Sequence, residues 1–305
     1  MNNKVVLGGS LMLTIENALL KVEIDEVGAQ ISHVIDKMGN FDYIWNGSQW
    51  PYHAPIKFPI IGKLNNQGQL QDKIDGINEN GFAYDMKWTV VDKGDDRVSL
   101  TLTQSESTLE DYPYEFSLMV TYSLTGNQLQ VDFYLKNTNS QAMPYSLGFA
   151  PTFNVPFIPD GTRLNFNNYE LNFMPEVQTL SHLELTQEKF LTGKELPIND
   201  AIKSRLPLNY QEFKNGPILI SNAGLTEVSL NSQNSEHQIQ LTLEDFPYLA
   251  VSTLGEQETQ FISIELMNGL PALSNQTNNE ENNLKQHQVL PPDQEAKLTT
   301  NITFK

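Results

Sequence analysis

Apolar and polar residues alternate one by one along five separate stretches of this 305-residue chain. The stretches are 20–25, 98–103, 129–136, 239–244 and 297–302. Successive side chains of a β-strand point to opposite faces of its sheet, so this alternation predicts strands with one buried face and one solvent-exposed face. Turn-forming residues lie between the stretches, at 38–40, 75–76, 125–127 and 291–293. The pattern therefore predicts antiparallel strands joined by turns.

Helical periodicity is weak along the whole sequence. No segment of a dozen residues repeats apolar side chains at three- and four-residue intervals, and the best short candidate for a helix is 186–191. No glycine-rich phosphate-binding loop is present, which disfavours an αβ nucleotide-binding fold. The residues thus predict an all-β protein, built as a large antiparallel β-sandwich.

The length and composition fit one large β domain. Apolar residues make up 39% of the chain and aromatic residues 10%, which is enough for a sizeable core. The polar stretch 275–283 indicates a solvated loop between two strands. We expect residues 1–12 to be an N-terminal extension and residues 13–305 to form a single domain. We interpret the extension as a segment that runs into the first strand and not as a signal peptide, because two glycines interrupt its short apolar run.

The charge balance excludes several classes of partner. The chain has 37 acidic and 19 basic residues, a net charge of −18, which repels phosphate backbones and anionic lipid. We therefore expect no nucleic-acid partner and no membrane partner. The absence of cysteine excludes disulfides and thiolate ligands and fits a cytoplasmic location. No metal, cofactor or serine nucleophile is expected either, because no ligand spacing or Gly-x-Ser-x-Gly motif occurs.

Four unusual segments carry the strongest functional signal. In chain order they are 54–64 (APIKFPIIGKL), 80–83 (NGFA), 144–154 (PYSLGFAPTFN) and 261–266 (FISIEL). The last ends on Glu265 after an apolar run, where a carboxylate is costly to desolvate unless it has a role or a partner. Together the four resemble the sugar-site segments of the aldose 1-epimerase (galactose mutarotase) family, and most closely its bacterial branch of galactose-mutarotase-related proteins. The resemblance covers roughly residues 13–304.

The resemblance implies a β-supersandwich of the galactose mutarotase type with an aldohexose bound in a concave groove. In that family a Glu removes the proton of the C1 hydroxyl while a His protonates the ring oxygen, so that the ring opens and recloses as the other anomer. A second His, an Arg and an Asp bind sugar hydroxyls. The alignment of the strand makes Glu265 the expected catalytic base.

Most of the other family side chains are replaced. Ala150 stands where relatives carry the acid His, and a methyl group cannot donate a proton. Asn80 replaces the second His and can still form a hydrogen bond to a hydroxyl. Lys63 replaces the Arg, which keeps the positive charge but loses the bidentate hydrogen bonding of a guanidinium. Lys57, where a Leu is typical, adds a further cation to the first segment.

Two registers place the family Asp differently. The register that fits more positions aligns it with Gly216, and the other aligns it with Asp200. Two more residues are expected to contact sugar. His53, alone among the five histidines, directly precedes a groove segment, and Phe153 is one of several aromatic residues that could stack on a pyranose ring, as are Trp45, Trp50 and Tyr52. The predicted substrate-binding set is Asn80, Lys63, His53 and Phe153.

Three functions stay open on the sequence. The first is an aldose 1-epimerase-like protein that acts on hexose anomers with weakened or lost catalysis, since losing a positioned general acid costs about 10²–10⁴-fold in rate. The second is a non-catalytic sugar-binding or sensing protein. The third, a hexose-6-phosphate 1-epimerase, is least favoured, because none of the three arginines falls in the four segments. The sequence indicates neither the sugar nor the oligomeric state.

Overall fold

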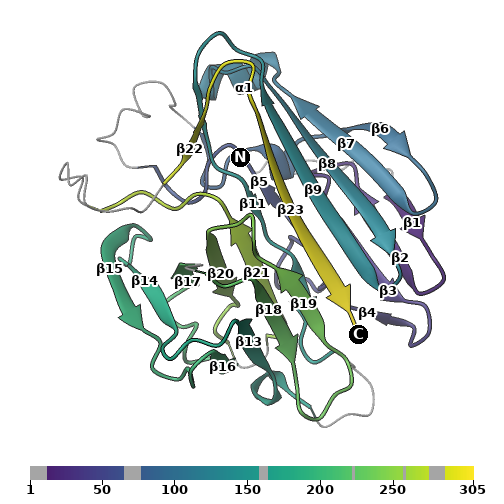
Figure 1. Ribbon diagram of the computed structural model, residues 1–305, viewed down its shortest axis with the longest axis vertical. Helices are drawn as coiled ribbons and strands as arrows, with labels where there is room; N and C mark the ends of the chain where they lie inside the picture. The colour runs from purple at the N-terminus through teal and green to yellow at the C-terminus, as the bar shows by residue number, and fades with distance from the viewer. Residues whose placement is uncertain (1–11, 65–76, 158–163, 222–223, 257–258, 275–285) are drawn as a thin grey trace, which may run out of the picture.

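A computed structural model describes residues 12–64, 77–157, 164–221, 224–256, 259–274 and 286–305. Residues 1–11 of the predicted extension, the turn at 75–76 and the loop at 275–283 lie outside the described residues. The strands of the described part form four sheets, and every strand pair is antiparallel (Figure 1). The predicted all-β class is confirmed.

The largest of these sheets has nine strands in the order β16-β13-β18-β19-β23-β9-β8-β7-β6. Their bounds are Thr89–Lys93 (β6), Arg97–Thr103 (β7), Phe116–Thr125 (β8), Gln128–Asn137 (β9), Glu170–Met174 (β13), Arg205–Pro207 (β16), Glu227–Asn231 (β18), Ile239–Thr242 (β19) and Glu295–Phe304 (β23). Buried and partly exposed residues alternate along β9 and β23, as the sequence predicted. Four of the five alternating stretches fall in this sheet, and the fifth, 20–25, is β2 of a smaller sheet.

A second large sheet carries eight strands in the described residues. Its order is β15-β14-β17-β20-β21-β11-β5, and β12 also pairs with β21. Their bounds are Ile56–Lys57 (β5), Gly148–Phe149 (β11), Thr152–Asn154 (β12), Ser181–Leu185 (β14), Leu191–Pro197 (β15), Ile218–Ser221 (β17), Tyr248–Ser252 (β20) and Phe261–Met267 (β21). All seven residues of β21 are buried, so this strand is covered on both faces.

Two smaller sheets complete the described strands. One has the order β1-β2-β3-β4 and the other pairs β10 with β22. Their bounds are Met12–Glu16 (β1), Leu20–Asp25 (β2), Ile31–Asp36 (β3), Phe41–Asp42 (β4), Met143–Tyr145 (β10) and Gln288–Leu290 (β22). Short helices connect strands: α1 (Glu106–Asp111) and the 3₁₀ turns η1 (Ala83–Asp85) and η2 (Phe166–Asn168). No helix in the described part of the chain is long and apolar enough to cross a membrane.

The helix predicted at 186–191 is wrong. Residues 186–190 form the turn of the hairpin between β14 and β15, and Leu191, the first residue of β15, pairs with Leu185 across it. The Lys189 backbone is left-handed, with φ of 67°, and its N–H donates to the Thr186 carbonyl at 3.0 Å. Six residues without a capping pattern do not outweigh the pairing of the flanking strands.

The two large sheets face each other across a common core. Phe133 of β9 packs on Phe149 of β11, with ring centroids 5.7 Å apart. The small β1–β4 sheet joins the same core: Phe41 of β4 packs on Tyr43, and Tyr43 packs on Phe304 of β23, each with ring centroids 4.8 Å apart. One connected apolar cluster extends in sequence from Leu13 to Phe304. The predicted large antiparallel sandwich is therefore confirmed.

Candidate functional site

The candidate site begins with the two faces of β21. Ile262, Ile264 and Leu266 lie in the main core, while the residues between them line a cavity on the opposite face of the sheet. A strand sends successive side chains to opposite faces, so one register divides this apolar strand into a core side and a cavity side. The cavity side carries Phe261, Ser263, Glu265 and Met267.

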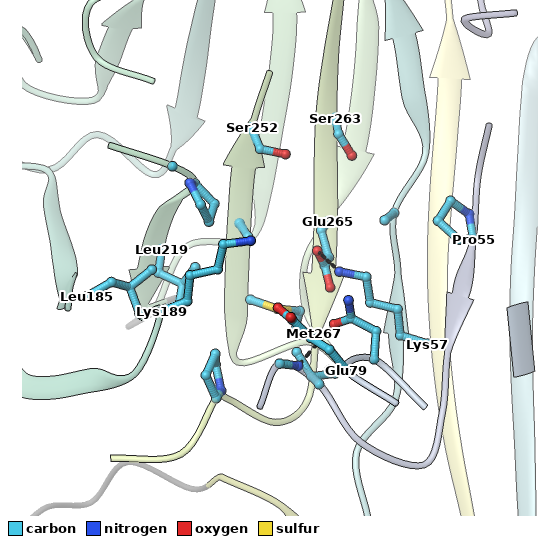
Figure 2. A pocket seen from close by; sticks show the side chains of 18 of the residues that line it. Pro55, Lys57, Glu79, Leu185, Lys189, Leu219, Ser252, Ser263, Glu265 and Met267 are labelled. Carbon is cyan, nitrogen blue, oxygen red and sulfur yellow. Dashed lines mark hydrogen bonds and ion pairs between the residues drawn. The ribbon is translucent and has the colours of Figure 1, made fainter. Parts of the chain in front are cut away.

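Neighbouring strands extend this floor. Ala250 of β20 lies opposite Glu265, and Leu219 of β17 lies opposite Ala250. Ser252 of β20 lies opposite Ser263 of β21, and both serines line the cavity above Glu265 in Figure 2. The floor therefore combines small and apolar side chains with two hydroxyls and one carboxylate.

The cavity has a volume of about 290 Å³ and is walled by loops and hairpin turns. Trp50 and Phe261 form an aromatic side, with ring centroids 6.5 Å apart and ring planes inclined by 29°. Lys189, on the turn between β14 and β15, extends its amine toward the centre of the cavity (Figure 2). Aromatic faces beside polar groups suit a ring that is apolar on its faces and hydroxylated on its edges.

Glu265 is paired with Lys57. The Lys57 Nζ donates to Glu265 Oε2 at 2.6 Å, and the side chains are only 17% and 12% exposed, respectively (Figure 2). The lysine comes from β5 and reaches across β11, where its pairing partner is Gly148. A Cβ at Gly148 would lie 3.2 Å from Glu265 Oε1 and 3.4 Å from Lys57 Cβ. The absence of a side chain at Gly148 thus leaves room for the Lys57 and Glu265 side chains to contact each other.

Polar atoms without partners gather at this cavity. Among the described residues, four buried side-chain polar atoms lack a hydrogen-bond partner, and two of them, Glu265 Oε1 and Thr253 Oγ1, belong to residues that line it. A third, Trp45 Nε1, belongs to a ring that packs on Phe261. Buried polar groups are ordinarily satisfied, so such a concentration is typical of a site for a polar ligand.

No metal centre forms in the described ranges: no group of three or more histidine or acidic side chains is placed to hold an ion. The described polar groups at the cavity are hydroxyls, an amide, amines and carboxylates. These groups can bind a hydroxylated ligand and exchange protons with it.

The sequence profile of the family described as Aldose 1-epimerase matches residues 12–291. The chain belongs to the aldose 1-epimerase family. Its curated relatives include Protein LacX, chromosomal, from Lactococcus lactis subsp. lactis, which is 28% identical over 298 residues, covering 94% of this chain and 97% of that protein. The resemblance inferred from the four segments is confirmed.

Solved structures agree with this membership. A galactose mutarotase-like protein from Lactobacillus casei is 32% identical with a TM-score of 0.85, covering 97% of this chain and 100% of that one. A galactose mutarotase related enzyme from Lactobacillus acidophilus shares the fold with a TM-score of 0.84 at 22% identity, covering 97% of each chain. A galactose 1-epimerase from Lactobacillus acidophilus NCFM shares it at 17% identity with a TM-score of 0.65, covering 96% of this chain and 94% of that one.

Two of the residues predicted from the aldose 1-epimerase pattern line the cavity. Glu265 lies on its floor, and Asn80 lies on its wall with the side-chain Oδ1 accepting a hydrogen bond from the Gly62 N–H at 3.0 Å. Ala150, the residue that the resemblance aligns with the family's acid His, also lines the cavity and is 4% exposed. Ala150 and Glu265 therefore face the same space.

Three other predicted sugar contacts do not line this cavity in the described residues. Lys63 is exposed, and its carbonyl accepts a hydrogen bond from the Ala272 N–H. His53 donates through Nδ1 to the Trp45 carbonyl at 2.8 Å, and Phe153 is fully buried in the core. Contacts of these three with a sugar stay predictions.

The two registers for the family Asp lead to different places. Gly216 lines the cavity, whereas Asp200 is exposed and accepts a hydrogen bond from Asn209 Nδ2 at 2.9 Å. Burial, and then the nearby Asp200 carboxylate, raise the pKa of Glu212. Asp200 thus lies with other polar groups outside the cavity lining, and Gly216 brings no side chain to the floor.

Sequence reasoning missed several cavity residues. Ser263 could have been found, because it precedes Glu265 by two positions and so shares its face of β21. Lys57 was noticed as a departure, but nothing in the sequence joins it to a carboxylate 208 residues away. Lys189 gave no signal, since its stretch was assigned to a helix instead of the turn that directs it into the cavity.

Proposed function

We propose that this protein binds a hexose in the cavity above β21 and interconverts its anomers at a low rate, with Glu265 as the base. The observation that carries the proposal is a nearly buried carboxylate on the floor of a cavity of about 290 Å³, on the residue that the resemblance aligns with the family's base. A carboxylate on a rigid central strand is held where a sugar hydroxyl can donate its proton.

The unpartnered polar atoms support a hydroxylated ligand. Glu265 Oε1 and Thr253 Oγ1 both belong to cavity residues, and hydroxyls of a sugar can both donate and accept hydrogen bonds. The aromatic side formed by Trp50 and Phe261 supports ring stacking. These features favour a monosaccharide ring whose edge faces β21.

Ala150 supports the low rate. A positioned general acid contributes about 10²–10⁴-fold to such a reaction, and the methyl group of Ala150 contributes none of it. The same residue favours a second candidate function, a sugar-binding or sensing protein without catalysis. The two candidates share the cavity and the ligand class, and they differ in turnover.

The test is the rate of α-to-β conversion of glucose and galactose, followed by NMR against a protein-free blank. We expect a rate above blank that Glu265→Gln abolishes. Glu244→Gln, which changes an exposed carboxylate outside the cavity lining, should leave the rate unchanged. Blank-level rates together with saturable sugar binding in calorimetry would support the sensing function. Absence of both turnover and binding would refute the proposal.

A further inference from the structure

Lys57 and Glu265 place an acid and a base side by side at the cavity. Their end groups are 2.6 Å apart, and each side chain is less than a fifth exposed. They come from strands on either side of β11, so their backbones are held by one sheet. Gly148 of β11 lies between them without a side chain, and the lysine crosses over it to reach the carboxylate.

We infer that Lys57 is the proton donor to the sugar ring oxygen, so that Lys57 and Glu265 act as an acid–base pair. The inference rests on the proposed function, because it requires a hexose in this cavity. It assigns the acid role to a residue on a different strand from Ala150, the position at which the family's imidazole is missing.

The geometry of a hemiacetal requires such neighbours. The ring oxygen and the C1 hydroxyl oxygen are bonded to the same carbon, so the groups that protonate one and deprotonate the other must also lie next to each other. Lys57 Nζ and Glu265 Oε2 are within hydrogen-bond distance. The ammonium has three N–H donors, and the described contacts of the pair use one of them, which leaves donors for the ring oxygen.

The proton transfers balance without a further reactant. The Glu265 carboxylate takes the proton of the C1 hydroxyl, the C1–O1 bond becomes a carbonyl, and the bond from C1 to the ring oxygen breaks. The electrons of that bond go to the ring oxygen, which takes a proton from the Lys57 ammonium. The products are the open-chain aldehyde, a carboxylic acid at Glu265 and a neutral amine at Lys57.

Ring closure returns both groups to their starting state. After rotation about C1–C2, the liberated hydroxyl attacks the other face of the carbonyl and gives its proton to the Lys57 amine. The new C1 oxygen takes the proton held by Glu265. Because the two side chains already share a hydrogen bond, a proton can also pass directly between them and restore the ion pair after an incomplete cycle.

A purely structural role for Lys57 makes a different prediction. If the lysine only neutralises Glu265, any cation that reaches the carboxylate will serve. Lys57→Arg keeps the charge and the hydrogen bond, but a guanidinium does not release its proton in proteins. Lys57→Met removes both the charge and the proton. The arginine variant therefore separates proton donation from charge compensation.

The experiment measures α-to-β conversion of glucose by NMR in the wild type, Lys57→Met, Lys57→Arg, Glu265→Gln and Lys93→Met, an exposed lysine on edge strand β6. We expect both Lys57 variants to lose about 10²-fold or more in turnover, down to the blank, while glucose still gives a saturable heat in calorimetry. Lys93→Met should match the wild type. Far-ultraviolet circular dichroism of each variant confirms that the protein tested is folded.

Wild-type turnover in Lys57→Arg would overturn the inference, and so would wild-type turnover in Lys57→Met. If Glu265→Gln abolished turnover and neither Lys57 variant did, the proposed function would stand without Lys57 as the acid. A wild-type protein that binds glucose but converts it at the blank rate would refute the acid–base pair and leave only the binding function. A protein that shows neither heat nor turnover would refute the proposed function itself.

Discussion

The pair between Lys57 and Glu265 predicts an unequal response to removing its two charges. Glu265 has a short side chain on a strand buried along its whole length, and its Oε1 already lacks a partner among the described residues. Lys57→Met would leave the whole carboxylate unpaired. Removing one partner of a buried ion pair costs about 3–5 kcal/mol of unfolding free energy, so we expect about 3 kcal/mol for this mostly buried pair.

The reverse substitution should cost less. In Glu265→Leu, the remaining Lys57 can turn its flexible stem toward the open side of the cavity and hydrate its ammonium. We expect a loss of about 1–2 kcal/mol, at the lower end for an unpaired polar group. Replacing both residues, Lys57→Met with Glu265→Leu, exchanges the ion pair for apolar contact and should lie within about 1 kcal/mol of the wild type.

Urea unfolding followed by tryptophan fluorescence measures all four proteins, and the double-mutant cycle gives the coupling directly. Lys93→Met, on the exposed edge strand, is the matched control and should lie within about 0.5 kcal/mol of the wild type. Additive single effects, or a Lys57→Met protein as stable as the wild type, would show that the charges do not depend on each other. The reasoning about the buried pair would then be wrong.

Three further predictions concern single side chains. Ala150→His should raise anomer turnover by about tenfold or more in the NMR assay, because it returns an imidazole to the cavity wall, whereas Ala150→Asn, similar in size but unable to act as an acid, should not. His33 donates through Nδ1 to Asp42 Oδ2 at 2.6 Å, and this hydrogen bond raises the pKa of His33 above 6.5. The stability that this pair supplies is therefore complete below pH 6.5 and lost as pH rises through the raised pKa; His33→Gln should remove that decline in urea unfolding between about pH 5.5 and 8.5. Phe153→Ala should cost about 3–5 kcal/mol in urea unfolding, because the ring is fully buried in the core.

The fold was predictable because its signal is local. Strands such as β2 and β9 alternate apolar and polar side chains, and each lies where the alternation predicted it, within a residue or two. The error at 186–191 has the same origin. A six-residue stretch contains too little periodicity to separate a turn from a helix, and the pairing of Leu185 with Leu191 decides between them.

The site was predictable only in part, because much of it is made by contacts between distant segments. Glu265 could be found from the apolar strand around it and from the resemblance to the epimerases. Its partner Lys57 could not be assigned, since the two are joined only when β5 and β21 are placed on either side of β11. His53 and Phe153 were selected for their residue type and neighbourhood, and neither property shows which way a side chain points.

The register of β21 has a consequence for how this protein can change. Core-facing and cavity-facing residues alternate along the strand. Inserting or deleting a single residue of the strand before Glu265 would therefore move each side chain to the opposite face of the sheet. The carboxylate would then lie in the apolar core that contains Phe133 and Phe149, and isoleucine would face the cavity. We therefore expect insertions and deletions to be tolerated in the hairpins and loops around the cavity, where chain length can vary without moving the Glu265 carboxylate.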